Sequence, residues 1–261
     1  MEESRMRLLF IRHGDPDYEH DTLTEKGRRE AQLLADRMVK ETVRDFYVSP
    51  LGRARDTAAY TLERLGRNAQ VKDWLQEFPA KVDVNLSENM QKAYPNTRRN
   101  ETGFKNRIAW DMVPSYWKNK PEYYDREAWH HSEMTLYSNI NEVYDSTCRG
   151  LDELLAQYGY IREGYLYHTE MGNNDTICFF CHFGVTCVLL SHLWGVSPFT
   201  IWHSTAMAPT SVTEVYTEER EKGIVSFRAS KIGDISHLYA GNEPPSFSAR
   251  FCEKYENDER H

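Results

Sequence analysis

The sequence has no excess of positive charge. Its 32 Lys and Arg residues are outnumbered by 40 Asp and Glu residues, which gives a formal net charge of −8 at pH 7. Proteins that bind the phosphate backbone of nucleic acids concentrate Lys and Arg on one face, so this balance disfavours a nucleic-acid-binding protein. A local basic pocket for a small anion remains compatible with it.

Several common enzyme motifs are also missing. The chain contains no Walker A loop, no GxGxxG and no GxSxG, which disfavours a nucleotide kinase, a dinucleotide-dependent dehydrogenase and a serine hydrolase. Its histidines form neither an HExxH motif nor a Cys/His cluster with the spacing of metal ligands. The sequence therefore predicts no metal site and no cofactor.

Signals for export and for membrane insertion are weak. The first ten residues, MEESRMRLLF, have neither the length nor the cleavage site of a signal peptide, so we expect a cytoplasmic protein. The segment from Ile177 to Thr213 contains no Asp, Glu, Lys or Arg, but His182, Gly184 and Pro198 interrupt it. We interpret it as a buried strand that runs into a buried helix, not as a membrane span.

The number of cysteines is odd, and they are Cys148, Cys178, Cys181, Cys187 and Cys252. In a chain without an export signal this count favours reduced thiols. Two of them form a CxxC in the apolar run ICFFCHF, where residues three apart on a strand point to opposite faces. We therefore expect Cys178 and Cys181 to be buried structural thiols.

Apolar periodicity predicts an α/β fold with a mostly parallel sheet, because strands and helices alternate along the chain. Strands are predicted at 7–11, 46–48, 71–74, 177–181, 212–216 and 225–228, and helices from an N-cap at Thr24, at 53–65 and at 185–194. The sheet is predicted to continue after a long interruption, so we expect one domain spanning residues 1–261.

The interruption covers about residues 78–175. It is rich in Trp, Tyr, Asn and Arg, contains Pro95, Pro114 and Pro121, and shows no convincing strand alternation. Its clearest helix is predicted at 135–158. A segment of this length is too long for a plain loop, so we predict a largely helical cap inserted into the domain.

Charged residues follow three of the predicted buried strands. Arg12 and His13 come directly after the first strand, Arg53 opens the helix after the second, and His182 follows ICFFC. Ligands of open α/β sheets bind beyond the carboxyl ends of strands, and a helix N-terminus attracts anions. A neutral imidazole is a competent nucleophile towards phosphorus, and a guanidinium can hold two phosphoryl oxygens.

Arg55 lies about 200° around the helix from Arg53, at about 100° per residue. We therefore assign Arg55 to the solvated face of the helix and Arg53 to the anion site. The sequence thus predicts a phosphate pocket that is assembled from three strand ends.

Four motifs in this order resemble the histidine phosphatase superfamily, also called the phosphoglycerate-mutase-like family. They are FIRHG at 10–14, LTEKG at 23–27, SPLGRARDTA at 49–58 and CHFG at 181–184. The resemblance implies a three-layer α/β/α fold, phosphorylation of His13, and phosphate binding by Arg12, Arg53 and His182. Phe183, where the family commonly has a second Gly, is included among the candidate phosphate-binding residues.

The family's acid is usually a carboxylate beyond the third strand. Glu77 matches that placement, and Asp73 is its rival. Attack by His13 on phosphorus needs positive charge around the phosphoryl oxygens, which the two guanidiniums and His182 would supply without a metal. A protonated Glu77 would then protonate the leaving group and afterwards activate water.

Three functions remain open at this point. The first is a phosphomonoesterase that acts on a small phosphorylated metabolite, and the second is a mutase-type phosphotransferase, for which Arg98, Arg99, Lys105 and Arg107 would serve a polyanion. The third is a non-catalytic protein that binds phosphorylated ligands. We prefer the phosphomonoesterase; the sequence names neither the substrate nor the oligomeric state.

Overall fold

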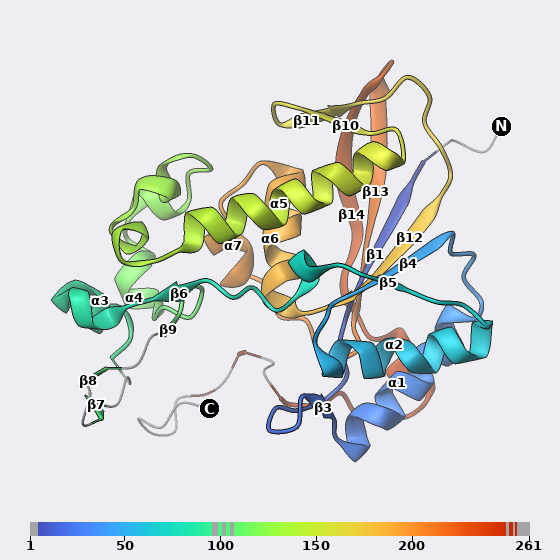
Figure 1. The fold of residues 1–261 in the computed structure, drawn as a ribbon, viewed down its shortest axis with the longest axis horizontal. Helices are drawn as coiled ribbons and strands as arrows, with labels where there is room; N and C mark the ends of the chain where they lie inside the picture. Colours follow the sequence, from blue (N-terminus) through green and yellow to red (C-terminus); the bar gives the residue numbers. More distant parts are fainter. Residues whose placement is uncertain are drawn as a thin grey trace.

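The computed structural model describes residues 5–95, 99–100, 103–104, 107–248, 251–252 and 254. Its centre is an eight-stranded sheet with the order β10-β11-β14-β13-β1-β12-β4-β5 (Figure 1). The central strands are β1 (Arg7–Arg12), β12 (Thr176–Cys181), β4 (Asp45–Val48) and β5 (Gln70–Val71), which are parallel to one another.

The other half of the sheet is antiparallel at each pairing. It contains β13 (Val212–Glu221), β14 (Ile224–Asp234), β11 (Leu166–His168) and β10 (Ile161–Glu163). Each antiparallel pairing reverses the strand direction. Relative to β1, β13 and β11 are therefore antiparallel, whereas β14 and β10 are parallel. The expected α/β class with a mostly parallel sheet is confirmed.

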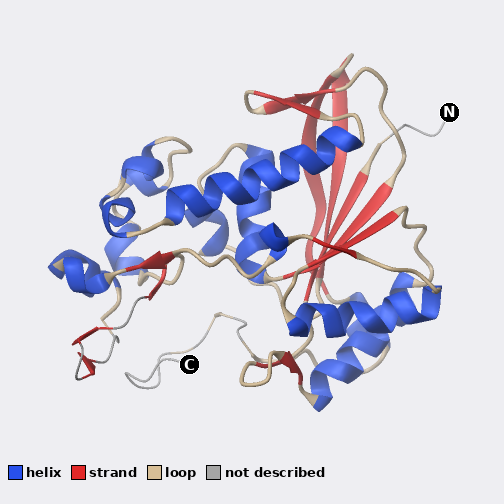
Figure 2. Ribbon diagram, viewed as in Figure 1, coloured by secondary structure: helices blue, strands red, loops and turns tan. Residues whose placement is uncertain are grey.

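Helices cover both faces of the sheet (Figure 2). On one face lie α1 (Glu25–Met38), α2 (Gly52–Leu65) and the short α8 (Ser236–Ala240), which packs on α1. On the other lie α5 (Ile140–Gln157), α6 (Phe183–Trp194) and α7 (Pro198–Trp202). The arrangement is the three-layer α/β/α architecture that the sequence motifs implied.

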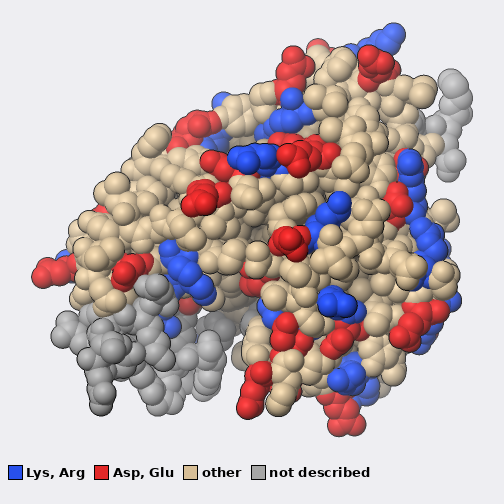
Figure 3. All heavy atoms as spheres, viewed as in Figure 1, with Lys and Arg blue, Asp and Glu red and all other residues tan. Residues whose placement is uncertain are grey.

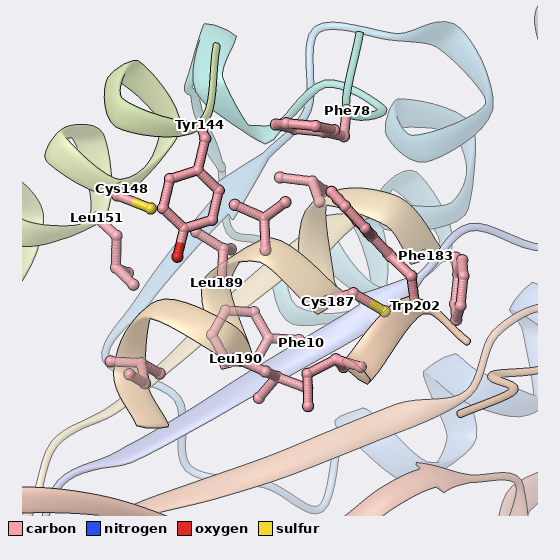
Figure 4. Packing of buried hydrophobic residues seen from close by; sticks show 14 of the residues in the cluster. Phe10, Phe78, Tyr144, Cys148, Leu151, Phe183, Cys187, Leu189, Leu190 and Trp202 are labelled. Atoms are coloured by element: carbon pink, nitrogen blue, oxygen red, sulfur yellow. The ribbon is translucent and has the colours of Figure 1, made fainter. Parts of the chain in front are cut away.

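Side-chain alternation along β1 explains the two cores. Leu8 and Phe10 join the apolar cluster on the α5 and α6 side, whereas Leu9 and Ile11 join the cluster on the α1 and α2 side. Successive residues of a strand point to opposite faces, so a strand covered on both sides must be apolar throughout. Figure 4 shows Phe10 close to Leu189 and Leu190 of α6, with Tyr144 and Leu151 of α5 above.

Local signals set the helix ends. The Thr24 hydroxyl accepts a hydrogen bond from the Gly27 N–H, as expected of an N-cap. Both α2 and α6 end at glycines in the left-handed conformation, Gly66 with φ 60° and Gly195 with φ 61°.

The third predicted strand is shorter than expected. Pairing with β4 ends at Val71, and Asp73–Leu75 form a 3-10 helix, η1, in place of the predicted strand end at Trp74. Its apolar residues are buried without joining the sheet, because Leu75 and the partly buried Trp74 pack into the core on the α5 side. This turn directs the chain towards the end of the sheet, where Glu77 lies.

Residues 78–175 contain short elements in addition to α5. The structure describes β6 (Lys81–Val82), β7 (Arg99–Asn100), β8 (Gly103–Phe104), β9 (Arg107–Ile108), α3 (Glu88–Ala93), α4 (Pro114–Trp117) and the 3-10 helices η2 (Val84–Leu86), η3 (Pro121–Tyr123), η4 (Ala128–His131) and η5 (Glu133–Tyr137). The helix predicted at 135–158 begins only at Ile140. The range also contains β10 and β11, two strands of the main sheet that were not predicted because their residues show no apolar alternation.

Two further short strands, β2 (Pro16–Asp17) and β3 (Thr22–Leu23), form a hairpin after β1. All five cysteines are free, and Cys178 and Cys181 are buried on opposite faces of β12, as predicted. Among the described residues, no helix combines the length and the apolarity that crossing a bilayer requires. Figure 3 shows acidic and basic side chains interspersed on one face of the molecule.

Gly150 allows α5 to pack closely on η1. A Cβ atom at this position would lie 2.7 Å from the Trp74 indole nitrogen. We expect Gly150→Ala to lower the free energy of unfolding, because overpacking costs about 1–3 kcal/mol whereas the better helix propensity of Ala returns about 1 kcal/mol. Urea denaturation measures the difference.

The control is Ser146→Ala at an exposed position of the same helix, which should change stability by less than about 0.5 kcal/mol. A Gly150→Ala variant as stable as the unmodified protein would show that the contact between α5 and η1 is not tight.

Candidate active site

Three parallel strands end side by side at the predicted site. Arg12 at the end of β1 is in register with Cys181 at the end of β12, and Phe180 of β12 is in register with Val48 of β4. The next residues along the three strands are therefore neighbours. They are His13, His182 and Ser49.

His13 is almost fully buried, with 1 % of its surface exposed. Its backbone N–H donates to the Cys181 carbonyl at 3.0 Å, which ties the end of β1 to the end of β12. Its ring nitrogen Nδ1 lies 2.7 Å from the Gly14 carbonyl oxygen. Because a carbonyl oxygen can only accept, Nδ1 carries the proton and Nε2 carries the lone pair.

His182 lies next to His13, and the centroids of the two rings are 5.1 Å apart. It is the N-cap residue of α6 and is fully buried. Its Nε2 forms a hydrogen bond of 2.7 Å with the Ser49 hydroxyl. Its Nδ1 is buried and has no hydrogen-bond partner in the part of the chain that the structure describes.

Two buried guanidiniums complete the predicted cluster. Arg12 is 4 % exposed, and its guanidinium donates to the Met207 carbonyl. Arg53 is 9 % exposed and lies in the first turn of α2, where its Nη1 donates to Asp21 Oδ1 at 2.6 Å. Arg55 is exposed, as predicted for the solvated face of the helix.

The arginines and burial keep both imidazoles neutral. Burial is the main cause that lowers the pKa of His13 well below its ordinary value, and the charges of Arg12 and Arg53 act in the same direction. Burial, His13 and the two arginines likewise lower the pKa of His182. An uncharged imidazole with its lone pair on Nε2 is the nucleophilic form.

Glu77 approaches from the segment that follows η1. It is partly buried, and its Oε1 accepts from the backbone N–H of Gly184 at 2.9 Å and of Phe78 at 3.0 Å. Burial raises the pKa of Glu77, although Arg12 and Arg53 act against this shift. Its rival Asp73 is exposed at the start of η1.

The Phe183 side chain is buried among other aromatic rings. Its ring is 1 % exposed and packs against Trp110 and Phe251. Any contact of Phe183 with an anion would have to come from its N–H at the first position of α6. Four basic residues were considered for a polyanion. The structure does not describe Arg98, Lys105 or the side chain of Arg99. The fourth, Arg107, is partly buried at the start of β9.

Four residues were missed by the sequence analysis. Ser49 orients His182, and Thr57 accepts the Gly14 N–H at 2.9 Å while its hydroxyl donates to the Arg53 carbonyl at 2.7 Å. Both lie in the motif at 49–58, which was a usable signal.

The other two, Tyr18 and Asp21, lie in the loop between β2 and β3. The Arg53 guanidinium lies 5.4 Å from the centre of the Tyr18 ring. Asp21 accepts from Arg53 and from the Gly52 N–H, the latter at 2.6 Å. Nothing local in the sequence points to them.

Metal ligation is not supported by the described residues, among which no group of three or more His, Cys, Asp or Glu side chains is placed to hold a metal ion. What the site offers is positive charge, helix N-terminal N–H groups and a neutral imidazole. This combination suits binding of a phosphate dianion and nucleophilic attack on it.

The buried neutral histidines predict a pH-dependent stability. Unfolding raises their pKa to about 6.5, so the unfolded chain takes up protons that the folded chain does not, and stability falls as the pH drops below about 6.5. Replacing His13 by Asn, or His182 by Gln, should reduce this loss by up to about 1.4 kcal/mol per pH unit between about pH 6.5 and 5. Urea denaturation at several pH values measures it.

The variants must be compared with the unmodified protein, because burial raises the pKa of Glu30 to about 7 and that shift acts in the opposite direction. His131→Gln at an exposed position is the control. Equal pH dependence in all four proteins would contradict the neutral, buried imidazoles.

Comparison with known proteins agrees with this geometry. Residues 8–116 match the family model of the histidine phosphatase superfamily (branch 1). A search of curated proteins returns no match.

Similar solved structures share the fold of the chain. One is a mycobacterial hydrolase with a TM-score of 0.55 at 18 % identity, covering 88 % of this chain and 99 % of the other. A second is a mycobacterial glucosyl-3-phosphoglycerate phosphatase with a TM-score of 0.53 at 20 % identity, covering 87 % of this chain and 97 % of the other. A third is a variant of phosphoserine phosphatase from Entamoeba histolytica in complex with phosphoserine. Its TM-score is 0.53 at 16 % identity, and the match covers 89 % of this chain and 99 % of the other. The resemblance of this chain to the histidine phosphatase superfamily, expected from its motifs, is thereby confirmed.

Proposed function

We propose that this protein is a phosphomonoesterase that acts through a phosphohistidine on His13. One observation carries the proposal: a buried imidazole has its proton fixed on Nδ1 by the Gly14 carbonyl, beside His182 and the two guanidiniums. The family match and the similar phosphatase structures support it. A related structure contains inorganic phosphate and another contains phosphoserine, which favours a small phosphorylated substrate here.

In the first step Nε2 of His13 attacks phosphorus, so that a P–N bond forms while the P–O bond to the leaving group breaks. Negative charge grows on the phosphoryl oxygens, where Arg12, Arg53 and His182 stabilise it. Glu77, whose pKa is raised by burial, gives its proton to the leaving oxygen.

In the second step the Glu77 carboxylate takes a proton from water, which attacks phosphorus and releases inorganic phosphate and neutral His13. We expect no requirement for a metal, because the two guanidiniums supply the charge that a metal supplies elsewhere.

We also propose that residues 78–175 form a cap on a single domain, and that the protein works in the cytoplasm. Glu77 lies where the cap begins, so the cap would shield the phosphohistidine from water until the leaving group departs. The five free cysteines fit a reducing compartment. We favour phosphatase over mutase, because the similar solved structures include several phosphatases.

His13→Ala should abolish both turnover and covalent labelling. We expect kcat to fall by at least about 10³-fold, because the nucleophile is lost. Protein incubated with a ³²P-labelled aryl phosphate and quenched with detergent at alkaline pH should carry label that is lost in acid only when His13 is present. His20→Ala, at an exposed histidine of the neighbouring loop, is the matched control.

Label that persists in His13→Ala would overturn the assignment. Phosphate binding without turnover in the unmodified protein would favour the non-catalytic alternative, and isomer formation without phosphate release would favour a mutase.

Glu77→Gln should separate the two steps. Nitrophenolate leaves without a proton, so p-nitrophenyl phosphate should give a rapid burst of about one equivalent of product followed by slow release of phosphate. Alkyl phosphates need the acid already in the first step, and we expect kcat for them to fall by about 10²–10⁴-fold without a burst.

Stopped-flow absorbance and phosphate release measure the two phases. Asp73→Asn, at the exposed rival carboxylate, should behave like the unmodified enzyme. Loss of activity in Asp73→Asn together with an unaffected Glu77→Gln would reverse the assignment of the acid.

A further inference from the structure

An aromatic cluster lies on the Glu77 side of the site. It consists of Trp110, Phe183 and Phe251, which come from three distant segments. The ring centroids of Trp110 lie 5.8 Å from those of both Phe183 and Phe251, and Phe183 and Phe251 are 4.7 Å apart. Trp110 and Phe251 are partly exposed and cover the buried Phe183. Figure 4 shows Phe183 at one end of α6, beside Trp202.

Trp110 packs directly against the start of α6. A Cβ atom on Gly184 would lie 2.9 Å from the Trp110 indole nitrogen and 2.6 Å from Glu77 Oε1. The same Gly184 donates its N–H to Glu77 Oε1. The absence of a side chain at Gly184 therefore lets the indole edge and the carboxylate lie next to each other.

The indole N–H of Trp110 finds no acceptor among the described residues. Its nitrogen is buried and has no hydrogen-bond partner within the described ranges. Leaving a buried donor unsatisfied costs about 1–3 kcal/mol, and buried indole N–H groups usually have a partner. An unpaired donor beside the proposed acid is explained if a bound molecule supplies an acceptor.

The C-terminal segment that carries Phe251 is anchored near the nucleophile loop. The Ser246 N–H donates to Glu30 Oε1 at 2.9 Å, and the Ser246 hydroxyl donates to Asp15, two residues after His13. Ser246 therefore lies beside the loop that carries His13, independently of the contacts within the cluster.

The chemistry of the leaving group fixes where it must lie. Its ester oxygen has to reach Glu77 within hydrogen-bond distance, while the phosphoryl group stays at His13 and the two guanidiniums. The organic part of the substrate then extends on the Glu77 side, where the aromatic cluster is.

We propose that the aromatic cluster binds the leaving group and selects phosphomonoesters of alcohols that carry a planar, apolar ring. Trp110 is the main specificity-determining residue, because its indole face meets the ring and its N–H meets an oxygen acceptor of the substrate. This inference rests on the proposed phosphatase function.

The test compares benzyl phosphate with ethyl phosphate. Both release primary alcohols of similar acidity, so they differ mainly in the ring. For the unmodified enzyme we expect kcat/KM to be at least about 10-fold higher for benzyl phosphate, since burying and stacking one ring contributes about this factor. Trp110→Ala should lower the benzyl-to-ethyl ratio by about 10-fold through KM, and change kcat/KM for ethyl phosphate by less than about 3-fold.

Trp110→Phe keeps a ring and should keep most of the preference. The control is Trp194→Leu at the C-terminal end of α6, about 16 Å from Phe183 at 1.5 Å per residue, which should leave the ratio unchanged. Circular dichroism checks that each variant is folded.

The two levels of the proposal fail differently. No turnover of either ester by the unmodified protein would refute the phosphatase function. Turnover of both esters with equal kcat/KM, or an equal loss for both in Trp110→Ala, would refute the role of the aromatic cluster and leave the phosphatase function standing. The wild-type ratio alone decides the matter if Trp110→Ala does not fold.

Discussion

The hydrogen bond between Nδ1 of His13 and the carbonyl oxygen of Gly14 determines what the site can do. It places the only ring proton on Nδ1 and leaves the lone pair on Nε2. Burial and two neighbouring guanidiniums make a second proton unfavourable. The same surroundings that destabilise an imidazolium would stabilise a bound dianion, so the proposed phosphate binding and nucleophilic attack would have one electrostatic origin.

Rigid backbone contacts hold that imidazole in place. The Gly14 N–H is bound by Thr57 of α2, whose hydroxyl also donates to the Arg53 carbonyl, so the nucleophile loop and the helix that carries Arg53 are joined. A Cβ atom on Gly14 would lie 2.8 Å from the Gly27 carbonyl oxygen, which shows how closely this loop meets the start of α1. Parallel pairing of β1 with β12 and of β12 with β4 brings in His182 and Ser49. The positions of these residues therefore follow largely from sheet register.

Much of this was readable from the sequence, because the signals were local. A buried strand followed by Arg-His-Gly, or by Ser-Pro and a helix with an early arginine, identifies a strand end and its helix N-terminus within about ten residues. The parallel strand ends then had to share one edge of the sheet. Glu77 was also found by position, although the 3-10 turn that presents it was predicted as the end of a strand, since short apolar runs do not distinguish the two.

Other features depend on contacts between distant residues and could not be read from the sequence. Asp21 accepts a hydrogen bond from Arg53 and has a left-handed backbone conformation with φ 48°. No residue pattern in the sequence predicts either feature. The Ser246 hydroxyl donates to Asp15, which lies far away in the sequence. Trp110 packs against Gly184, which is also distant in the sequence. Strands β10 and β11 have only three residues each, too few to show a period of two.

The central claim is the protonation state of His13, and ¹⁵N NMR of the histidine side chains tests it most directly. Long-range ¹H–¹⁵N spectra of the full chain assign the tautomer and follow it from about pH 7.5 to about 6, around the ordinary histidine pKa of about 6.5. We expect His13 to be neutral with its proton on Nδ1 throughout this range. An imidazolium at neutral pH, or a proton on Nε2, would contradict it.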